Sequence, residues 1–516
     1  MGSKRSLIRS SSSLALATIL SRILGLVRVV LSANYLGGGV LASAWFYSFM
    51  IPNLFRRLLG EGALGSALLP IVSYAEVNST KSEVRKKITV ILSTLFLVLL
   101  TLCVALAILS LFISQYTDNE MYLLILKTVP VIIPYALLIC MTGAITSALN
   151  SYNIYFLPAL GAILLNIFLI SAYYFVCPHF IGQPNDILRT LAISVVLAGI
   201  TQLSLVVVLL IRLELFPHIS EVFSKELWCN QFETLKELWR LTLPALLGAG
   251  ALQLSMFIDK SLALMLGDAA LPALTYSDRI VYLPIGVFAV SFGTVSLSHM
   301  SKSAAKGDAI ELANTLTKAL EYLLLICIPI AGFIIVFRKL IIATLFLHGE
   351  FDLNALDETS YAMFYYAMGI PAFASIKIVV SAFHSRKDMK TPVKISLICI
   401  IINLILNLSL MFYMKQAGLA LATVISSLLN NLLLLRILRK ELNIRFLPLI
   451  KLILVYSCIT SVAVLLTSYL RNIVLLSYGN ILVLMVCGGV FILLYLIGLL
   501  CVYRERILDI KQFLKR

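Results

Sequence analysis

Several arginines of this 516-residue chain lie inside long apolar stretches, where a charged side chain is costly. Arg22 and Arg28 fall within SRILGLVR (21–28), and Arg56 lies within IPNLFRRLLGEGALGSALLP (51–70). An arginine at the centre of a membrane-spanning helix costs about 2.5–3.5 kcal/mol on insertion scales, so it must find water or a partner. Because guanidinium stays charged and offers a planar fork of donors, a buried arginine cluster predicts a phosphate or pyrophosphate ligand.

The sequence around these arginines predicts a polar cavity. Arg22 and Arg28 are six residues apart, which places them about 120° apart around a helix, so both can face one broad space. The stretch around Arg56 is interrupted by helix-breaking residues, namely Pro52, Gly60, Gly62, Gly65 and Pro70. Non-helical backbone at membrane depth is tolerated only against protein or a water-filled space. A cavity next to this stretch explains both features.

Other cations also lie in apolar stretches: Arg57, Lys260, Arg279 and Lys377. Each buried cation could instead reach the lipid headgroups or pair with a nearby acid. The acids concerned are Glu61, Asp259 and Asp278. For Arg57, Lys260 and Lys377 both interpretations stay open. The first two spans hold too few acids to neutralise their three arginines, so a ligand is expected to supply the missing negative charge.

A second pattern could bind a cation. Asp259 lies in one apolar stretch, and Asn403 and Asn407 lie one helical turn apart in another. Oxygen ligands of this kind suit Na⁺ or a proton-coupled carboxyl group. The alternative is that the amides form hydrogen bonds between helices.

Motifs of hydrolytic enzymes are absent from the sequence. It has no Walker loop (G-x-x-x-x-G-K-[ST]), no H-E-x-x-H and no G-x-S-x-G, and its five histidines are far apart. The nine cysteines form no Cys-x-x-Cys pair and are expected to pack in the interior. We therefore predict a protein that is not an enzyme, that needs no cofactor, and whose transport is driven by gradients or partners.

The elements that must position these residues are membrane-spanning helices. The chain is 60% apolar and 13% charged, whereas a soluble domain is roughly a quarter charged. Apolar runs of about 20 residues recur, and each is long enough to cross the bilayer as a helix. Hydropathy predicts fourteen spans: 13–36, 40–75, 88–115, 121–149, 156–177, 190–212, 236–266, 270–300, 311–336, 359–384, 392–413, 416–435, 446–470 and 476–503.

Alternate loops differ in charge, which predicts the orientation of the chain. One set of loops holds most of the Lys and Arg, in residues 4–9, 81–87, 225, 302–306, 386–390, 436–445 and 504–516. The opposite set holds only Arg189, Arg338, Lys339, Lys415 and Arg471. Both termini are therefore expected in the cytoplasm. The excess of 41 Lys and Arg over 25 Asp and Glu reflects this topology, and nucleic acid is not expected as a partner.

Both chain ends carry features of their own. Arg22 and Arg28 interrupt the first apolar run and no cleavage site follows it, so this span is expected to be retained and not removed as a signal peptide. The tail RERILDIKQFLKR (504–516) suits either a segment lying on the anionic inner leaflet or a solvated end.

An internal repeat predicts the domain organisation. TSALNSYNIYFLP (146–158) aligns with VSAFHSRKDMKTP (380–392), and the two segments follow the predicted fourth and tenth helices. Two six-helix units of parallel topology are implied, as in many transporters. We predict an all-α integral membrane protein with an N-lobe (1–215), a C-lobe (216–440), and two further helices with a basic tail (441–516).

Four segments in this order resemble the MurJ/MviN family: SRILGLVR, PNLFRRLLGEGALGSALLP, YSDRIVYLPIGVFAVSFGT (276–294) and SRKDMKTPVKI (385–395). That family contains bacterial lipid II flippases of the multidrug/oligosaccharidyl-lipid/polysaccharide exporter superfamily. The resemblance implies two six-helix lobes around a central cavity, with two C-terminal helices that border a groove for the polyprenyl tail. It also implies a multi-pass protein of the bacterial cytoplasmic membrane that works in peptidoglycan and cell-wall synthesis.

The resemblance assigns the substrate site to Arg22, Arg28, Arg56 and Arg279. A family-like sodium site would use Asp259, Asn403, Asn407 and Thr423, although Asn407 replaces an expected Asp. Other departures are Ser43, where many members have Asp, and Val29 and Tyr282, where acids are common. These three changes leave open whether a salt-bridge latch gates this protein.

The function expected from these observations is the flipping of lipid II from the inner to the outer leaflet by alternating access. Membrane potential or Na⁺ would drive the cycle, and membrane lipids and cell-wall or division proteins would be further partners. One alternative is an exporter of another polyprenyl-linked oligosaccharide or of a drug. Another is a membrane scaffold for cell-wall enzymes that transports nothing, for which buried arginines would be dispensable.

Overall fold

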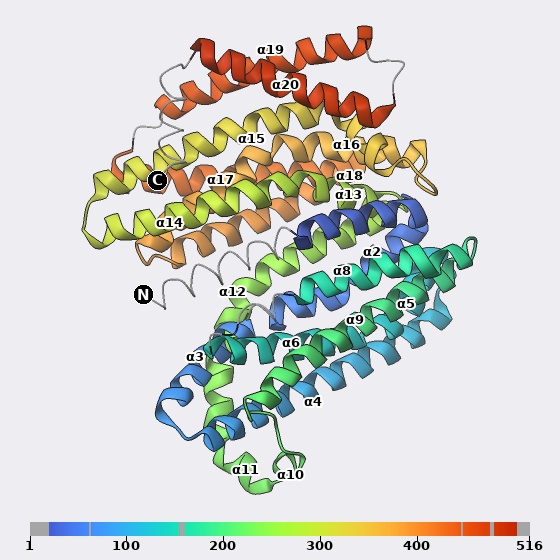
Figure 1. Cartoon of the computed structure of the whole chain (residues 1–516), viewed down its shortest axis with the longest axis vertical. Coiled ribbons are helices and arrows are strands. Elements are labelled where there is room, and N and C mark those ends of the chain that lie inside the picture. The colour runs from blue at the N-terminus through green and yellow to red at the C-terminus, as the bar shows by residue number, and fades with distance from the viewer. Residues whose placement is uncertain are drawn as a thin grey trace. The chain divides into compact units, whose positions relative to one another are not determined.

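The computed structural model describes residues 20–60, 63–152, 154, 160–444, 447–474 and 479–502 (Figure 1). Helices make up nearly all of this part, and no strand occurs in it. The prediction of an all-α fold is confirmed. Several predicted features lie outside the described residues: the start of the first span, Glu61, Gly62, part of the repeat segment 146–158, and the tail 504–516.

Contacts divide the chain into two compact units, Met1–Leu271 and Pro272–Arg516. The first unit contains a helix over residues 20–36, α2 (Val40–Phe55), η1 (Arg56–Gly60), α3 (Ala63–Asn78), α4 (Lys81–Ile113), η2 (Ser114–Tyr116), α5 (Glu120–Ile132), α6 (Pro134–Ser151), α8 (Gly161–Ser171), η3 (Ala172–Val176), η4 (Cys177–Phe180), α9 (Pro184–Arg212), α10 (Ile219–Val222), α11 (Lys225–Asn230) and α12 (Phe232–Met265).

The second unit begins within α13 (Ala270–Pro284). It continues through η5 (Ile285–Ala289), α14 (Val290–Ala305), α15 (Ala309–Phe346), α16 (Leu353–Met368), α17 (Ile370–Ser385), α18 (Lys390–Leu442), α19 (Leu447–Val474) and α20 (Asn480–Val502). Within this unit α15 packs against α16, α17 and α19.

Every predicted span contains helix in its described residues. Within that part, eight helices are long and apolar enough to cross a membrane, and two bent pairs raise this to ten candidates. The number fourteen itself stays a prediction. The predicted spans 392–413 and 416–435 correspond to two helices that share the label α18, and the non-helical backbone of Lys415 (φ 49°, ψ −133°) separates them.

The two units repeat the same helix interruptions. In each, a Tyr-Ser pair is followed nine residues later by a five-residue π-helix: Tyr47 precedes η1 and Tyr276 precedes η5. The pair α5 and α6 bends by 45° and the pair α16 and α17 by 41°, and a proline begins the second helix of each pair or follows its first residue. These matched positions agree with the internal repeat.

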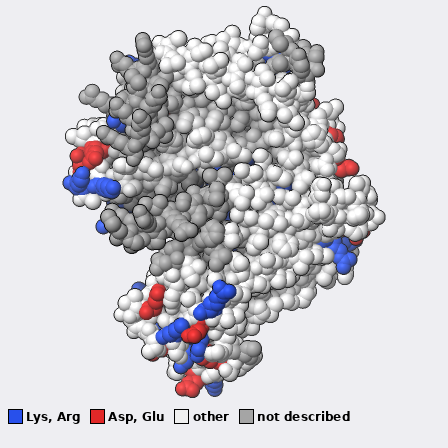
Figure 2. Space-filling model, in the orientation of Figure 1, with Lys and Arg blue, Asp and Glu red and all other residues white. Residues whose placement is uncertain are grey.

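Helix α12 belongs to the first unit by its packing, because it lies against α2, α3 and η1. The predicted lobes 1–215 and 216–440 are defined by the sequence repeat and stay a prediction. The exterior is apolar, as lipid contact requires: Leu97, Ile108 and Phe112 of α4 are all exposed. Figure 2 shows broad areas without charged side chains between clusters of Lys, Arg, Asp and Glu.

Candidate arginine site

Three of the four predicted substrate residues lie in the first unit. Arg22 and Arg28 lie on the helix over residues 20–36, and Arg56 follows the last residue of α2. All three side chains are half-buried, whereas Arg279 is exposed on α13 and belongs to the second unit. The grouping of Arg279 with the other three therefore stays a prediction.

One face of α2 links Arg28 to Arg56. Phe49, Asn53 and Arg56 are spaced i, i+4 and i+7 along the chain, which aligns them on one side of the helix. We call these three residues the α2 stripe. The Cζ of Arg28 lies 5.8 Å from the centre of the Phe49 ring, within the range of a cation–π contact.

The α2 stripe is held together by hydrogen bonds. The Asn53 side-chain amide donates through Nδ2 to the carbonyl oxygen of Phe49 at 2.9 Å. Its Oδ1 accepts a hydrogen bond from Nε of Arg56 at 3.2 Å. The neutral amide of Asn53 thus contacts Arg56. Phe49, to which this amide is hydrogen-bonded, contacts Arg28.

The predicted interruption of the second span is present and begins at the predicted arginine. Pro52 lies buried inside α2 without a backbone N–H, and after Phe55 the helix widens into η1, which starts at Arg56. At the other end of η1, the carbonyl oxygen of Gly60 would lie only 2.5 Å from a Cβ placed on Gly143 of α6. Glycine at position 143 permits this close approach, which fixes η1 against α6.

Arg57 is exposed and points to α12. Its Nη1 lies 3.3 Å from Oε1 of Gln253 and 3.7 Å from Sδ of Met256. On the same helix, Ser261 Oγ lies 3.1 Å from the hydroxyl oxygen of Tyr47 of α2. These contacts place polar groups of α12 beside both α2 and η1.

The helix that carries Arg22 and Arg28 is anchored by polar residues that the sequence did not single out. Ser32 Oγ lies 2.9 Å from both the carbonyl oxygen of Arg28 and the hydroxyl oxygen of Tyr173. Asn166 of α8 donates to the carbonyl oxygen of Ser21 at 3.1 Å. Polar residues inside the apolar run 156–177 were a signal that could have drawn attention to this contact.

Two of the three departures from the family pattern, Ser43 and Val29, are buried, whereas Tyr282 is exposed. Ser43 is fully buried and its hydroxyl donates to the carbonyl oxygen of Asp268 at 2.5 Å. Val29 is also buried, and the ring of Tyr282 stacks on that of Phe373 with centroids 5.5 Å apart. In this protein, packing and a backbone contact occupy the positions where an acid would stand.

The residues of the predicted cation site fall into both units. Asp259 lies on α12 in the first, whereas Asn403, Asn407 and Thr423 lie on α18 in the second. Asn407 donates through Nδ2 to Oδ1 of Asn403 at 3.1 Å, and Thr423 donates to the carbonyl oxygen of Leu419 at 2.9 Å. The described residues contain no group of three or more His, Cys, Asp or Glu that could hold a metal ion. The site stays a prediction.

The cysteines form no disulfide among the described residues, and six of the nine are buried. The exposed ones are Cys229, Cys458 and Cys501. The prediction that cysteines pack in the interior therefore holds for the majority.

Comparison with known proteins gives a consistent result. Residues 32–487 match the family model described as Lipid II flippase MurJ. A probable lipid II flippase MurJ of Buchnera aphidicola subsp. Acyrthosiphon pisum is 31% identical over 446 residues, covering 83% of this chain and 83% of that protein. The lipid II flippase MurJ of Burkholderia cenocepacia is 30% identical over 437 residues, covering 82% of each.

Solved structures resemble the chain over most of its length. The structure described as lipid II flippase MurJ in an inward closed conformation has a TM-score of 0.80 and 25% identity, and the match covers 96% of this chain and 99% of that one. An inward-facing multidrug resistance MATE transporter of the MOP superfamily has a TM-score of 0.63 and 17% identity, covering 82% and 94%. The latter shows a shared fold alone.

Proposed function

The chain belongs to the lipid II flippase MurJ family, and from this premise we propose that it moves lipid II from the inner to the outer leaflet of the bacterial cytoplasmic membrane. It is a multi-pass membrane protein and a transporter. The cycle is alternating access, in which the polar head crosses through the protein while the polyprenyl tail stays in lipid. The fold shared with MATE transporters supports this cycle.

Four arginines would bind the pyrophosphate of lipid II: Arg22, Arg28, Arg56 and Arg279. The observation that carries this proposal is the α2 stripe, which connects Arg28 and Arg56 through Phe49 and Asn53. Guanidinium groups recognise phosphoryl oxygens bidentately, and the half-buried setting weakens competition from water. Arg279 would contribute from the second unit.

The energy source is proposed to be membrane potential, with Na⁺ as a coupling ion. Moving one elementary charge across the membrane is worth about 2.3 kcal/mol per 100 mV, which suits an anionic cargo and a cationic site. The ion would bind at Asp259, Asn403, Asn407 and Thr423. No cofactor and no hydrolysis within the chain is required.

Both termini are proposed to be cytoplasmic, since the alternate loops that the predicted topology groups with the chain ends carry most of the Lys and Arg. Lipid II is the substrate, and the surrounding membrane lipids are constant partners. Cell-wall synthesis or division proteins are proposed partners that would supply lipid II or consume it.

A complementation experiment tests the transport function. In cells depleted of their own flippase, the wild-type chain should restore lipid II that is accessible at the outer face. The Arg28→Ala variant should not, because one guanidinium of the site is lost. Arg212→Ala, which removes an exposed arginine at the end of α9, is the matched control and should behave as wild type. Full exposure by Arg28→Ala would exclude the arginine-based mechanism, whereas failure of the wild-type chain to restore exposure would favour the scaffold alternative.

A further inference from the structure

We infer that Asn53 and Phe49 are positioning residues that hold Arg56 and Arg28 for a diphosphate, so that the site selects pyrophosphate-linked lipids over monophosphate-linked ones. The inference rests on the proposed function, because it concerns how the same arginines recognise their ligand. Neither residue carries a charge, and each contacts one arginine of the predicted site.

The orientation of the Asn53 amide is determined by its two neighbours. One end faces a carbonyl oxygen, that of Phe49, which can only accept a hydrogen bond. The other end faces Nε of Arg56, which can only donate. Reversing the amide would place donor against donor and acceptor against acceptor, so a single orientation satisfies both contacts. The side chain of Asn53 is therefore a fixed acceptor for Arg56.

Fixing Nε restricts how Arg56 can bind a phosphate. A guanidinium group has five donors and can present either its side, with Nε and one Nη, or its end, with both Nη atoms. Because Asn53 accepts from Nε, the edge of the guanidinium group that carries Nε is held by the protein. The same contact holds the guanidinium plane in place before the ligand arrives, which lowers the cost of binding.

Phe49 connects this arrangement to Arg28. Its ring lies beneath the Arg28 guanidinium, while its carbonyl oxygen anchors Asn53. Phe49 therefore contacts Arg28 through its ring and is linked to Arg56 through Asn53. A diphosphate presents two linked phosphoryl groups and can use both arginines together, whereas a monophosphate can use fully only one. The α2 stripe thus favours the diphosphate.

A double-mutant cycle in lipid nanodiscs tests the inference, with undecaprenyl pyrophosphate and undecaprenyl phosphate as probes. Asn53→Ala should weaken binding of the pyrophosphate probe about tenfold, and should weaken binding of the monophosphate less. In an Arg56→Ala background the same substitution should change neither affinity, since the group that it positions is gone. Phe49→Leu should likewise weaken binding of the pyrophosphate probe in the wild-type background and change neither affinity in an Arg28→Ala background. Phe49→Trp keeps an aromatic ring beside Arg28 and should bind both probes like wild type.

Asn78 is a matched control for the loss of an asparagine. Its Nδ2 donates to the carbonyl oxygen of Tyr74, four residues earlier, at 3.0 Å, which is the same local bond that Asn53 makes. Asn78→Ala should leave both affinities unchanged. If Asn53→Ala does not fold, Asn53→Asp takes its place. The carboxylate of the new aspartate would neutralise Arg56, so the Asn53→Asp variant should also lose its preference for the pyrophosphate probe.

Two results would overturn the inference in distinguishable ways. An equal loss from Asn53→Ala in the wild-type and Arg56→Ala backgrounds, or an unchanged preference for the diphosphate, would show that Asn53 does not act through Arg56. If Arg28→Ala and Arg56→Ala themselves bind the pyrophosphate probe like wild type, the arginine site fails, and the positioning role fails with it.

Discussion

Arg56 and Arg57 are adjacent in the chain, yet their surroundings differ. Arg56 is half-buried and bonded to Asn53, whereas Arg57 is exposed and contacts Gln253 of α12. The chemistry expected of each follows from this difference. Arg56 is positioned in the manner of a binding residue, and Arg57 bridges two neighbouring elements of the first unit.

Arg56→Lys should separate charge from geometry. Lysine keeps the positive charge but lacks both the Nε donor that meets Asn53 and the planar fork. We expect the affinity for undecaprenyl pyrophosphate to fall about tenfold while thermal stability is unchanged. Binding isotherms and a melting curve on the same nanodisc preparation provide the measurement. Wild-type affinity would mean that a point charge at this position is sufficient.

Ser43→Asp tests whether the acid that many family members carry can be restored here. The side chain of Ser43 is fully buried against the carbonyl oxygen of Asp268, so a carboxylate would face an acceptor without water. We expect the free energy of unfolding to fall by on the order of 3 kcal/mol, against about 1 kcal/mol for Ser43→Ala. Thermal unfolding of the three proteins measures this, and equal melting temperatures would contradict it.

The sequence alone was enough to identify the charged residues of the site, but not their uncharged partners. The cost of a buried charge singled out Arg28 and Arg56 without any structure. Phe49 and Asn53 carry no such cost, and a phenylalanine or an asparagine in a helix has many ordinary uses. Their spacing from Arg56 was readable, but nothing in the sequence showed that Arg28 would lie over the Phe49 ring.

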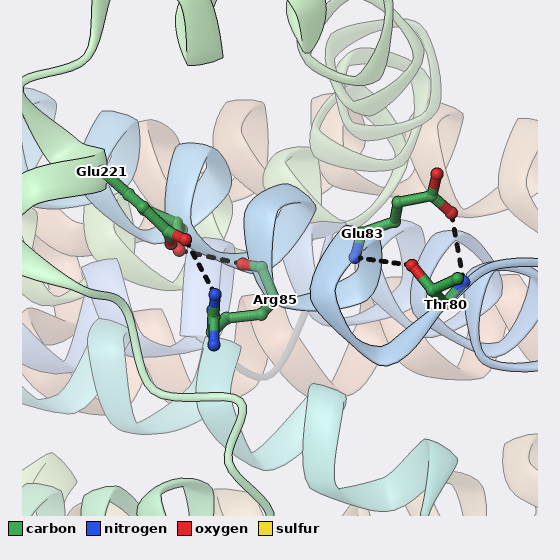
Figure 3. Close-up of polar contacts among 5 residues, drawn as sticks. Thr80, Glu83, Arg85 and Glu221 are labelled. Carbon is green, nitrogen blue, oxygen red and sulfur yellow. Dashed lines mark hydrogen bonds and ion pairs between the residues drawn. The ribbon is translucent and has the colours of Figure 1, made fainter.

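Among the elements, the segment between α9 and α12 is attached to the start of α4 by two ion pairs. Arg85 pairs with Glu221 of α10 at 2.8 Å, and Lys81 pairs with Glu214 at 2.7 Å. Figure 3 shows the first pair beside the Thr80 and Glu83 capping box that begins α4. The pairs differ in burial: the side chains are 22% and 20% exposed in the first and 56% and 76% exposed in the second.

Breaking the Arg85 pair should release this segment. Arg85→Ala leaves the carboxylate of Glu221 partly buried without its partner, which costs about 1–3 kcal/mol locally. We expect faster trypsin cleavage after Lys225 in α11, and restored resistance in the charge swap Arg85→Glu with Glu221→Arg. Mass spectrometry of the fragments follows the cleavage.

Lys81→Ala is the control for that experiment. Its pair is exposed, and such pairs contribute little in water even though the hydrogen bond from Lys81 lowers the pKa of Glu214. Cleavage after Lys225 should therefore stay at the wild-type rate. Equal acceleration by both substitutions would show that burial does not decide the strength of the attachment.

Asp388 should stabilise the start of α18 in a pH-dependent way. Its Oδ1 accepts hydrogen bonds from the backbone N–H groups of Lys390 and Thr391, and the bonds from Thr391 lower the pKa of the carboxyl group from its ordinary value of 3.8. A lowered pKa means that the stabilisation is complete above pH 3.8 and is lost as the pH falls through the folded-state value.

We expect Asp388→Ala to reduce stability by about 1 kcal/mol at neutral pH, and Asp388→Asn to lose less. The difference between wild type and Asp388→Asn should shrink as the pH falls below 3.8, and melting curves across pH measure it. A difference that does not depend on pH would show that the charge is irrelevant to the cap.

Element positions were predictable from hydropathy, whereas their breaks were only partly so. Prolines and glycines announced the interruption at η1. The equivalent π-helix η5 follows Pro284 and contains Gly286, but one proline and one glycine do not by themselves predict a π-helix. A π-helix needs one extra residue in a turn, and its cause lies in packing against neighbouring helices, which a single segment does not reveal. The break at Lys415 was predictable, because its charge interrupts the apolar pattern between the spans 392–413 and 416–435.

For the whole molecule, the proposed orientation can be checked with a native residue. Cys229 is exposed on α11, in a segment expected on the cytoplasmic side. With Cys458 and Cys501 replaced by serine, a membrane-impermeant maleimide should label inverted vesicles and not intact cells. Labelling of intact cells would show that Cys229 faces the outside, and the proposed orientation would then be wrong.

The repeat predicted two related halves but could not say with which half the helix over 232–265 would pack. Sequence similarity records which helices correspond, while packing depends on side chains far apart in the chain. In the structure, α12 lies with α2 and α3. The loop after it contains Gly267, whose positive φ of 119° suits a turn between elements.

The packing of α12 also determines where this polypeptide can be divided for co-expression as two fragments. A cut after residue 215 would separate α12 from α2, α3 and η1, against which it packs. A cut at Gly267 would keep these contacts within one fragment and fall in an exposed turn. Cells that make fragments 1–267 and 268–516 from separate genes should therefore assemble the protein more readily than cells supplied with halves divided at the sequence repeat.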